Sequence, residues 1–341
     1  MKLVVGFLTY QELSAKYLTD FLPSLEAALG FLPPDDYRVL VFDNSPSDDQ
    51  SNISILEKFN AGELITNDNR CASIPRVIFQ HQTVGQNIGF SRAYNILIRS
   101  ALSLQAEYFL IINPDTFIEP GAIQKLVAAL DNNASLGSAA PKIRRWDFVH
   151  KIKTNFIDSA GLILKPGLKF FDLGQGEEDK GQFDKASIIG PSGAAGLFRL
   201  SALSEIGERG DREADWQYFD EHFFMYKEDC DLNYRLFSVG YFSCLVPEAL
   251  VFHDRTAASS GQSLPSILLD RRKKSRQVRI WSFVNQHLLF VKHWKKQNFA
   301  VRMIIIYRIL VMFIFSLILE QYLLKSYWSI SRLSGGLTNI K

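Results

Sequence analysis

The chain has 341 residues and a formal net charge of only +2, so its overall charge gives no indication of nucleic-acid binding. The three cysteines, Cys71, Cys230 and Cys244, are too few and too scattered for a disulfide framework, and no CxxC pair suggests zinc. The first ten residues read as a strand and not as a signal peptide, because no small-residue cleavage site follows them. We therefore expect a cytoplasmic protein.

Strand-like and helix-like segments alternate through the first half of the chain. The expected strands are Leu3–Leu8, Arg38–Phe42, Val77–Phe79 and Tyr108–Ile112. The expected helices, each following one of these strands, are Ala15–Leu29, Ile53–Phe59, Phe90–Leu104 and Pro120–Leu130. This alternation predicts an α/β fold with a mostly parallel central sheet and helices on both faces.

The apolar run Tyr108–Ile112 stops abruptly at Asn113, Pro114 and Asp115. A continuous apolar run is typical of a buried central strand, and α/β sheets bind ligands at the carboxyl ends of their strands. Pro114 ends ladder pairing at this point, which leaves the Asp115 carboxylate free. Asn, Pro and Asp are also common in turns for conformational reasons, so a plain turn is the alternative.

Polar loops also follow the other expected strands. Thr9–Glu12 follows the first strand and Asp43–Asp49 the second. An acidic residue directly after a buried strand can accept hydrogen bonds from a base or ribose, although Asp is also an ordinary turn and cap residue. In the third loop Gly89 opens a helix, whose free N–H groups can face a phosphate or simply form an N-terminal turn.

These strand-end loops contain a set of motifs in a fixed order. The motifs are Asp43-Asn44-Ser45, Asn87-Ile88-Gly89-Phe90 with Asn95, Asn113-Pro114-Asp115, Gly190 to Arg199, Phe219 to Leu232, and His253. Together they resemble the signatures of family-2 inverting glycosyltransferases with the GT-A fold, particularly the rhamnosyltransferase-like branch. The resemblance covers roughly residues 1–255.

The resemblance implies a nucleotide-sugar site and a metal site. Residues implied to bind the nucleotide sugar are Thr9, Tyr10, Glu12, Asp43, Asn44, Asn87, Gly89, Phe90, Asn95, Asn113 and Pro114. Asp115 is the implied ligand for Mg²⁺ or Mn²⁺, and His253 is the second. Asn113 replaces the first carboxylate of the two-aspartate form of the motif, and an amide carbonyl is a weaker ligand for a hard cation. We therefore expect metal binding to depend on the donor's own phosphates.

Inverting transfer requires a general base for the acceptor hydroxyl. Asp229 is the implied base and Glu228 the main alternative. Asp231 stands four residues before Arg235, which predicts a structural ion pair. Residues implied to contact the acceptor are Gly193, Ala194, Ala195 and Trp216; close packing is the alternative for the small residues, and a place in the core is the alternative for Trp216 and for Tyr218.

The C-terminal third is basic and then apolar. Between Arg271 and Arg302 no acidic residue occurs, and the basic residues are Arg271, Arg272, Lys273, Lys274, Arg276, Arg279, Lys292, Lys295, Lys296 and Arg302. The aromatic and apolar residues among them, from Trp281 to Trp294, predict a helix on an anionic membrane surface. Met303–Leu319 is apolar except for Arg308 and Ser316. Because an arginine at mid-depth is costly unless it snorkels, we expect an interfacial helix or a contact between subunits of a homo-oligomer, and not a span.

These observations divide the chain into residues 1–255, the catalytic domain, and residues 256–341, a membrane-associated or oligomerising region. Within the first, residues 1–117 are expected to bind the nucleotide sugar and residues 118–255 the acceptor. The branch resemblance implies transfer of L-rhamnose from dTDP-rhamnose to a lipid-linked glycan of a bacterial surface polysaccharide, at the inner face of the membrane. Alternatives are a UDP-sugar donor or a catalytically silent sugar-nucleotide-binding protein. A nucleotidyltransferase is disfavoured because the Thr9–Glu12 loop lacks a glycine- and arginine-rich phosphate motif.

Overall fold

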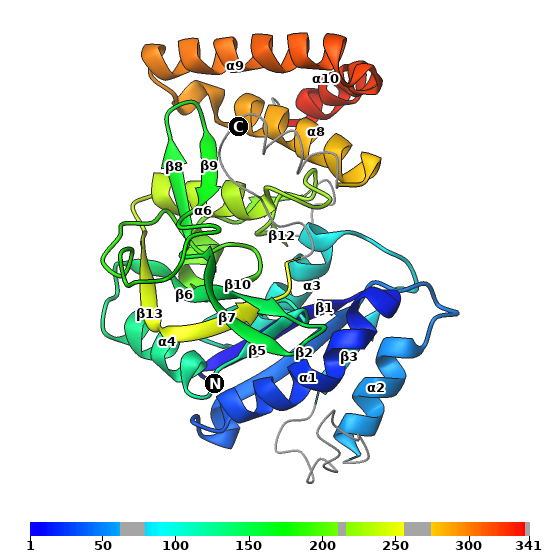
Figure 1. The fold of residues 1–341 in the computed structure, drawn as a ribbon, viewed down its shortest axis with the longest axis vertical. Helices are drawn as coiled ribbons and strands as arrows, with labels where there is room; N and C mark the ends of the chain where they lie inside the picture. The colour runs from blue at the N-terminus through cyan, green and yellow to red at the C-terminus, as the bar shows by residue number, and fades with distance from the viewer. Residues whose placement is uncertain (62–78, 211–215, 256–273, 338–341) are drawn as a thin grey trace.

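The computed structural model describes residues 1–61, 79–210, 216–255 and 274–337. A nine-stranded sheet of order β3-β2-β1-β4-β10-β6-β13-β5 forms its centre, with β7 paired to β6 (Figure 1). Its strands are β1 (Leu3–Thr9), β2 (Tyr37–Asp43), β3 (Phe79–Thr83), β4 (Tyr108–Ile112), β5 (Thr116–Ile118), β6 (Leu136–Asp147), β7 (Ile152–Ser159), β10 (Ala195–Arg199) and β13 (Phe242–His253). Two-stranded sheets are formed by β8 (Leu162–Lys165) with β9 (Lys169–Asp172) and by β11 (Glu208–Arg209) with β12 (Trp216–Gln217).

The strands β3, β2, β1 and β4 are parallel, which confirms the predicted α/β class. β4 has the predicted bounds, whereas residues 77 and 78 of the predicted third strand lie outside the described residues. The register places Thr9 beside Asp43 and Asp43 beside Thr83. The polar loops that follow these strands therefore meet at one edge of the sheet.

The second half of the sheet adds functional residues to the same edge. β10 runs antiparallel to β4, and just beyond this pair the Asn113 N–H donates to the Ala194 carbonyl at 2.9 Å. β13 runs antiparallel to β5, which aligns His253 with Thr116. His253 is thereby held next to the turn that contains Asp115, although the two are far apart in sequence.

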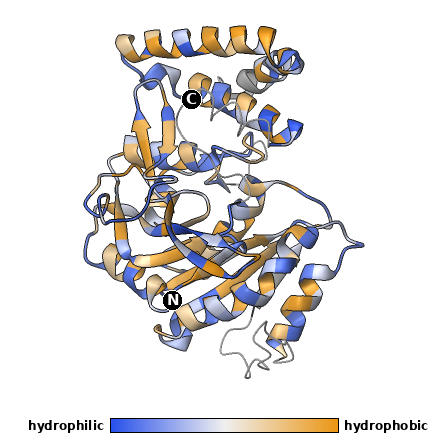
Figure 2. Cartoon of the chain, viewed as in Figure 1, coloured by the Kyte–Doolittle hydropathy of each residue, from blue (hydrophilic) through white to orange (hydrophobic). Residues whose placement is uncertain are grey.

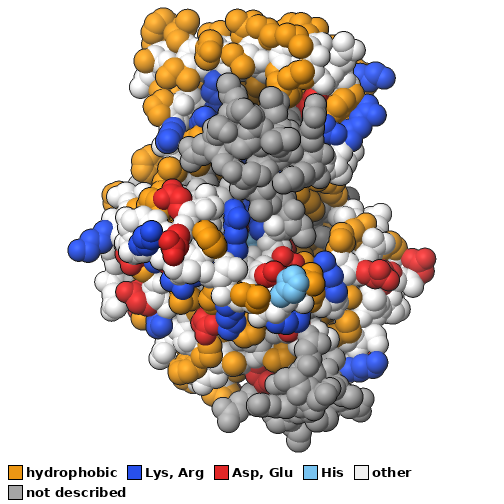
Figure 3. All heavy atoms as spheres, in the orientation of Figure 1, with side chains coloured by type: hydrophobic (Ala, Val, Ile, Leu, Met, Phe, Trp, Pro, Cys, Tyr) orange, Lys and Arg blue, Asp and Glu red, His pale blue; other side chains and the backbone are white. Residues whose placement is uncertain are grey.

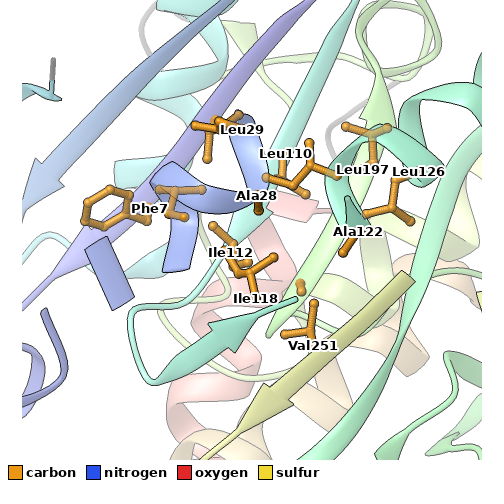
Figure 4. Close-up of a cluster of buried hydrophobic side chains, with 14 of the residues drawn as sticks. Phe7, Ala28, Leu29, Leu110, Ile112, Ile118, Ala122, Leu126, Leu197 and Val251 are labelled. Carbon is orange, nitrogen blue, oxygen red and sulfur yellow. The ribbon is translucent and has the colours of Figure 1, made fainter. Parts of the chain in front are cut away.

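Helices cover both faces of the sheet. They are α1 (Gln11–Leu29), α2 (Ser51–Asn60), α3 (Phe90–Ser103), α4 (Ala122–Asp131), α5 (Leu200–Glu205) and α6 (Glu228–Ser238), with a short 3₁₀ helix η1 (Pro34–Asp36). On one face Leu29 of α1 and Leu126 of α4 join Leu110 and Val251 of the sheet in one buried cluster (Figure 4). On the other face α3, α5 and α6 contribute to a second cluster around Phe109. Complete burial of such side chains stabilises the fold by about 1.5–3 kcal/mol each.

The C-terminal elements stack on the body at the end opposite α1 and α2 (Figure 1). They are α8 (Arg276–His293), η2 (Trp294–Lys296), α9 (Phe299–Ile318), η3 (Gln321–Lys325) and α10 (Ser326–Leu337). The prediction that the basic segment lies on a membrane is wrong for α8, because Phe283, Leu288, Leu289 and Phe290 are buried in a cluster that includes Phe223 and other residues of the body. Residues 271–273 of that segment lie outside the described residues.

Candidate active site

Asp43, at the end of β2, is buried and fixed by hydrogen bonds. Its Oδ1 accepts from Thr9 Oγ1 and from Ser45 Oγ, both at 2.8 Å, and from Asn52 Nδ2 at 3.3 Å. Asp43 also borders a hollow of about 430 Å³ in the loops after β2 and β3. The lining of this hollow is completed by Pro46, Ser47, Asp49, Gln50, Ile53, Thr83, Val84 and Gly85. The local hydrogen bonds orient one carboxylate oxygen inward, which holds the side chain rigidly at the border of the hollow.

The loop after β1 leads directly into α1. The Tyr10 N–H donates to Ser14 Oγ at 3.0 Å, and the Tyr10 side chain is half-buried. Glu12 lies in the first turn of α1 and is exposed to solvent. The helix therefore begins at Gln11, four residues before the predicted Ala15, because the polar residues that we read as a loop form its first turn.

The N-terminus of α3 is held by the protein chain, in contrast to the open phosphate site expected there. The Gly89 N–H donates to Asn87 Oδ1 at 2.9 Å, and the Phe90 N–H donates to the Phe224 carbonyl at 2.8 Å. Asn44 Oδ1 accepts from the Ile88 N–H at 3.2 Å. Gly89 has φ 85°, and a Cβ there would lie 2.7 Å from the Phe224 carbonyl oxygen. This glycine is thus explained by its contact with residue 224.

Asn95 and Phe90 have structural positions. The Asn95 side chain is fully buried, and its Oδ1 accepts from the N–H groups of Tyr218 and Phe219 at 2.9 and 2.8 Å. Its Nδ2 donates to the Phe219 carbonyl at 2.8 Å and to Glu221 at 3.0 Å. Phe90 packs against Phe219 in the core. Because all of these contacts are internal, both residues shape the site in place of the direct sugar-nucleotide contact that we expected.

Asp115 lies at one end of a short chain of charged groups. Its Oδ2 is 3.3 Å from His253 Nε2, and His253 Nδ1 is 2.8 Å from Asp158 Oδ2. The Asp115 Oδ1 atom is buried and has no hydrogen-bond partner in the structure. Asn113 is half-buried and Pro114 is buried, so of the three residues in this turn only Asp115 contributes a charge. A buried carboxylate oxygen without a partner is costly unless a ligand satisfies it.

The chain of charges continues through residues that the sequence did not identify. Arg255 lies 3.3 Å from Asp158 Oδ1 and 3.0 Å from Asp172 Oδ2. Asp158 is at the end of β7 and Asp172 at the end of β9. Neither belongs to a recognisable motif, because only the pairing of distant strands brings them here. Arg255, a cation two residues after the predicted site residue His253, was the only sequence feature that could have suggested acidic partners at this place.

Asp115 and His253 could serve as two ligands of a divalent cation if the phosphates of the donor supplied the others. Within the described part of the chain, no group of three or more His, Cys, Asp or Glu residues could hold a metal alone. Burial lowers the pKa of His253, but the charges of Asp115 and Asp158 outweigh it and raise the pKa to about 10. His253 would lose this proton on binding a metal, with Asp158 orienting the ring as carboxylates do behind metal-bound histidines.

Asp229 lies in the first turn of α6, and the loop that bonds to it also bonds to the turn of residues 113–115. Its Oδ2 accepts from the Gly193 N–H at 2.9 Å and its Oδ1 from the Cys230 N–H at 2.8 Å. Burial and the charge of Asp172 raise its pKa, against the effect of these two N–H groups. Tyr226 and Lys227, which precede the helix, both have positive φ (73° and 69°). Such conformations in residues other than glycine cost about 1–3 kcal/mol each and are frequent at functional sites.

Glu228 differs from Asp229 in its surroundings. It is only 6% exposed, and its Oε2 has no hydrogen-bond partner in the structure. Burial, followed by the charge of Asp229, raises its pKa well above the usual range. Burial and the charge of Asp229 thus disfavour the charged form of Glu228, whereas Asp229 is half-buried and bonded to the Gly193 N–H.

Asp231 is structural, as predicted. It lies 2.8 Å from Arg235 Nε, 3.1 Å from Lys292 and 2.7 Å from His293 Nε2. Burial would raise the pKa of Asp231, but Lys292 and Arg235 lower it well below its ordinary value. This buried network fastens α8 to α6 and thereby supports the segment that presents Asp229.

The expected acceptor residues separate into two groups. Gly193 contacts Asp229, whereas Ala194 and Ala195 are buried in the main core. Trp216 lies on β12 and is 46% exposed, and its carbonyl accepts from Arg99 of α3. Tyr218 is only 5% exposed and packs in the core, so its stacking on a sugar is excluded in this arrangement.

The model of the family "Glycosyl transferase family 2" matches residues 5–207, which include β1 to β4, the Asp115 turn and the Gly193 loop. The chain belongs to this family. The expected family relationship is confirmed, and the sheet with its flanking helices is the GT-A fold. In this family 2 glycosyltransferase the candidate residues Asp43, Asp115 and Asp229 lie at the edge of the sheet where the strand-end loops meet.

Relatives of this family 2 glycosyltransferase include the N-acetylglucosaminyl-diphospho-decaprenol L-rhamnosyltransferases of two Mycobacterium tuberculosis strains, CDC 1551 and H37Rv. Each is 26% identical over 208 residues, a match that covers 56% of this chain and 63% of the relative. The chain thus spans less than two thirds of these relatives. Crystal structures of S. aureus TarS overlap with it at a TM-score of 0.48 and 15% identity, covering 86% of this chain and 44% of TarS. For TarS 1–349 in complex with UDP the shares are 86% and 72%.

Proposed function

We propose that this glycosyltransferase moves L-rhamnose from dTDP-rhamnose to a hydroxyl of a lipid-linked glycan, with inversion at the anomeric carbon, in bacterial surface polysaccharide synthesis. The observation that supports the proposal is that the turn containing Asp115 and the side chain of Asp229 both bond to one loop, at adjacent residues. The Asn113 N–H bonds to the Ala194 carbonyl, and the neighbouring Gly193 N–H bonds to Asp229. We assign Asp115 to the donor side of the site and Asp229 to the acceptor side.

The roles follow from the surroundings of each group. Asp229 would remove the proton from the acceptor hydroxyl, and its raised pKa makes it a stronger base than an ordinary aspartate. Asp115 and His253 would hold Mg²⁺ or Mn²⁺ together with the donor diphosphate. A bound divalent cation would neutralise the charge that develops on the departing diphosphate. Asp43, fixed by Thr9 at the border of the hollow, would accept hydrogen bonds from the base or ribose.

The donor is proposed from the rhamnosyltransferases of M. tuberculosis, which share 26% identity with this chain. Their lipid-linked acceptor supports a polyprenol-linked glycan here. The alternative donor is a UDP-sugar, and a silent sugar-nucleotide-binding protein is the alternative from another functional class. The unpartnered Asp115 oxygen favours a metal-dependent enzyme over the silent protein.

A thermal-shift screen tests the proposal. The purified chain is heated with dTDP-rhamnose, UDP-sugars or GDP-sugars, each with and without Mg²⁺ or Mn²⁺, since a ligand that binds the native state raises Tm by mass action. We expect the largest shift with dTDP-rhamnose and metal. Asp115→Ala should abolish the metal-dependent part, whereas Asp147→Ala, at a surface pair with His150, should not. A larger shift with a UDP-sugar would replace the donor, and equal shifts with and without chelator would contradict the metal role.

A further inference from the structure

One face of α9 is apolar and uncovered along its whole length. Its exposed residues are Phe299, Ala300, Met303, Ile304, Ile306, Tyr307, Leu310, Val311, Phe313, Ile314, Leu317 and Ile318, and none of them carries a charge. Figure 2 shows the helix as mostly hydrophobic, and Figure 3 shows an apolar layer at the same end of the molecule. We call these residues the α9 face. Exposed apolar patches of this extent mark interaction sites.

The opposite side of α9 is packed on the protein. Ile305 and Ser316 are fully buried, and Arg308 donates to the Gly167 carbonyl in the turn between β8 and β9. At the border of the α9 face, Gly167 approaches so closely that a Cβ there would lie 2.6 Å from Ile304. The arginine within the apolar run thus faces the protein.

These contacts decide how α9 can meet a membrane. By length and composition the helix could cross one, and only 11% of its most apolar window is buried. Crossing would separate α9 from the β8–β9 turn and carry the charge of Arg308 into the hydrocarbon layer. Lying in the membrane plane keeps the Arg308–Gly167 hydrogen bond and buries the α9 face. The packed arrangement therefore fits an interfacial helix.

The charges around the α9 face select lipid over a second copy of the chain. From residue 274 to residue 337 the sequence has ten lysines and arginines against one acidic residue, Glu320, which pairs with Arg279 at 2.8 Å. Of these cations Lys292 is already held by Asp231 of the body at 3.1 Å. Lys295 and Lys296, in the turn before α9, are exposed. A symmetric contact between two α9 faces would bring the basic residues of both copies close together, and they would repel each other. Anionic lipid headgroups would neutralise these residues instead.

Aromatic residues beside the face fit the same partner. Tyr307 is 66% exposed and Trp328 of α10 is 62% exposed. Arg332 lies 3.5 Å from the centre of the Trp328 ring. Tyrosine and tryptophan with neighbouring basic side chains are enriched at the boundary between headgroups and hydrocarbon.

We propose that the α9 face docks on the surface of an anionic lipid bilayer, with the helix in the membrane plane and the nucleotide-binding half of the sheet directed away from it. The surface is distinct from the transfer site and does not depend on the identity of the donor. If the proposed function is right, docking through the α9 face would bring the transfer site close to a lipid-linked acceptor at the inner face of the cell membrane.

Vesicle binding tests the proposal with the full chain. The protein is sedimented with sealed vesicles of phosphatidylcholine alone or with added phosphatidylglycerol. We expect binding that strengthens with phosphatidylglycerol and weakens with salt. The double variant Leu310→Asp/Ile314→Asp should bind more than tenfold more weakly, because two charges would enter the apolar layer. Val149→Asp/Phe31→Asp, with the same charge change at exposed apolar positions of the body, should bind like the wild type.

A second variant separates the electrostatic part. Lys295→Gln/Lys296→Gln should weaken binding to anionic vesicles by about 10- to 30-fold and leave binding to neutral vesicles unchanged. Thermal melting of each variant checks that it is folded. If the wild-type chain binds neither type of vesicle, the proposal is wrong. A stable dimer in light scattering that fails to bind vesicles and becomes monomeric in Leu310→Asp/Ile314→Asp would contradict it as well.

Discussion

Replacing the two neighbouring carboxylates separately, as Asp229→Asn and Glu228→Gln, distinguishes the proposed base from its rival. Asp229 accepts a backbone N–H on each oxygen, from Gly193 and from Cys230. An asparagine offers only one oxygen, so its NH₂ group would face one of these donors and leave it unpaired. That loss costs about 1–3 kcal/mol of stability, and loss of the base lowers turnover by about 10²–10⁴-fold.

Glu228→Gln should behave differently. Burial and the charge of Asp229 already favour the neutral form of Glu228, and its Oε2 has no partner to lose. Replacing a neutral acid by an amide of similar size therefore changes little, and we expect less than a tenfold effect on turnover and about 1 kcal/mol or less on stability.

The assay compares initial rates of sugar transfer at saturating donor, together with the donor affinity and the Tm of each variant. For Asp229→Asn we expect nearly unchanged donor affinity, because the proposed role of Asp229 is to act on the acceptor hydroxyl. A drop of 10²-fold or more in Glu228→Gln with near-normal turnover in Asp229→Asn would refute the reasoning and make Glu228 the base.

Three further predictions concern stability and pH. Asp231→Asn should destabilise the chain by about 3–5 kcal/mol in urea unfolding, because buried cations lose their carboxylate, against under about 1 kcal/mol for Glu178→Gln in an exposed pair. Since the native pKa of Asp231 is lowered, its stabilisation is present at neutral pH and is lost on acidification below about pH 4, so the wild type should lose more stability there than Asp231→Asn. Gly89→Ala should cost about 1–3 kcal/mol or more, from strain at φ 85° and contact with Phe224; an unchanged Tm would contradict this. The raised pKa of Asp229 should place the acid limb of kcat/KM above about pH 4, where an ordinary aspartate titrates, and a midpoint below that value would contradict its role.

The parallel half of the fold could be predicted from the sequence because its signals are local. The apolar run of β4 stops at Ile112, where Asn113 and Pro114 interrupt it, and the strand has the bounds predicted. The remaining strands β10, β6, β13 and β5 have no such signal, since their order depends on contacts between distant segments. The environment of α8 was misjudged for the same reason, because a helix with basic and aromatic residues reads alike whether its apolar side meets lipid or a protein core.

The candidate site shows the same division. Asp43 and Asp115 come at the ends of predicted strands, so their positions in the sequence indicated them, whereas Asp229 was implied only by its place in a family motif. Asp158 supports His253 at 2.8 Å from the end of β7, a place that only the assembled sheet reveals. For Asn95 the motif indicated that the residue matters but not whether its role is structural or ligand-binding. An asparagine that fixes the backbone and one that binds a ligand look the same in a sequence motif.

The most direct test of the proposed rhamnosyl transfer is to measure the transfer of the sugar to lipid. The chain is incubated with dTDP-rhamnose labelled in the sugar, Mn²⁺ and bacterial membranes, and label is measured in the extracted lipid. We expect metal-dependent label in the lipid fraction that falls by at least 10²-fold in Asp229→Asn. Label that stays in the aqueous phase with the wild type, while the dTDP-sugar binds, would contradict it.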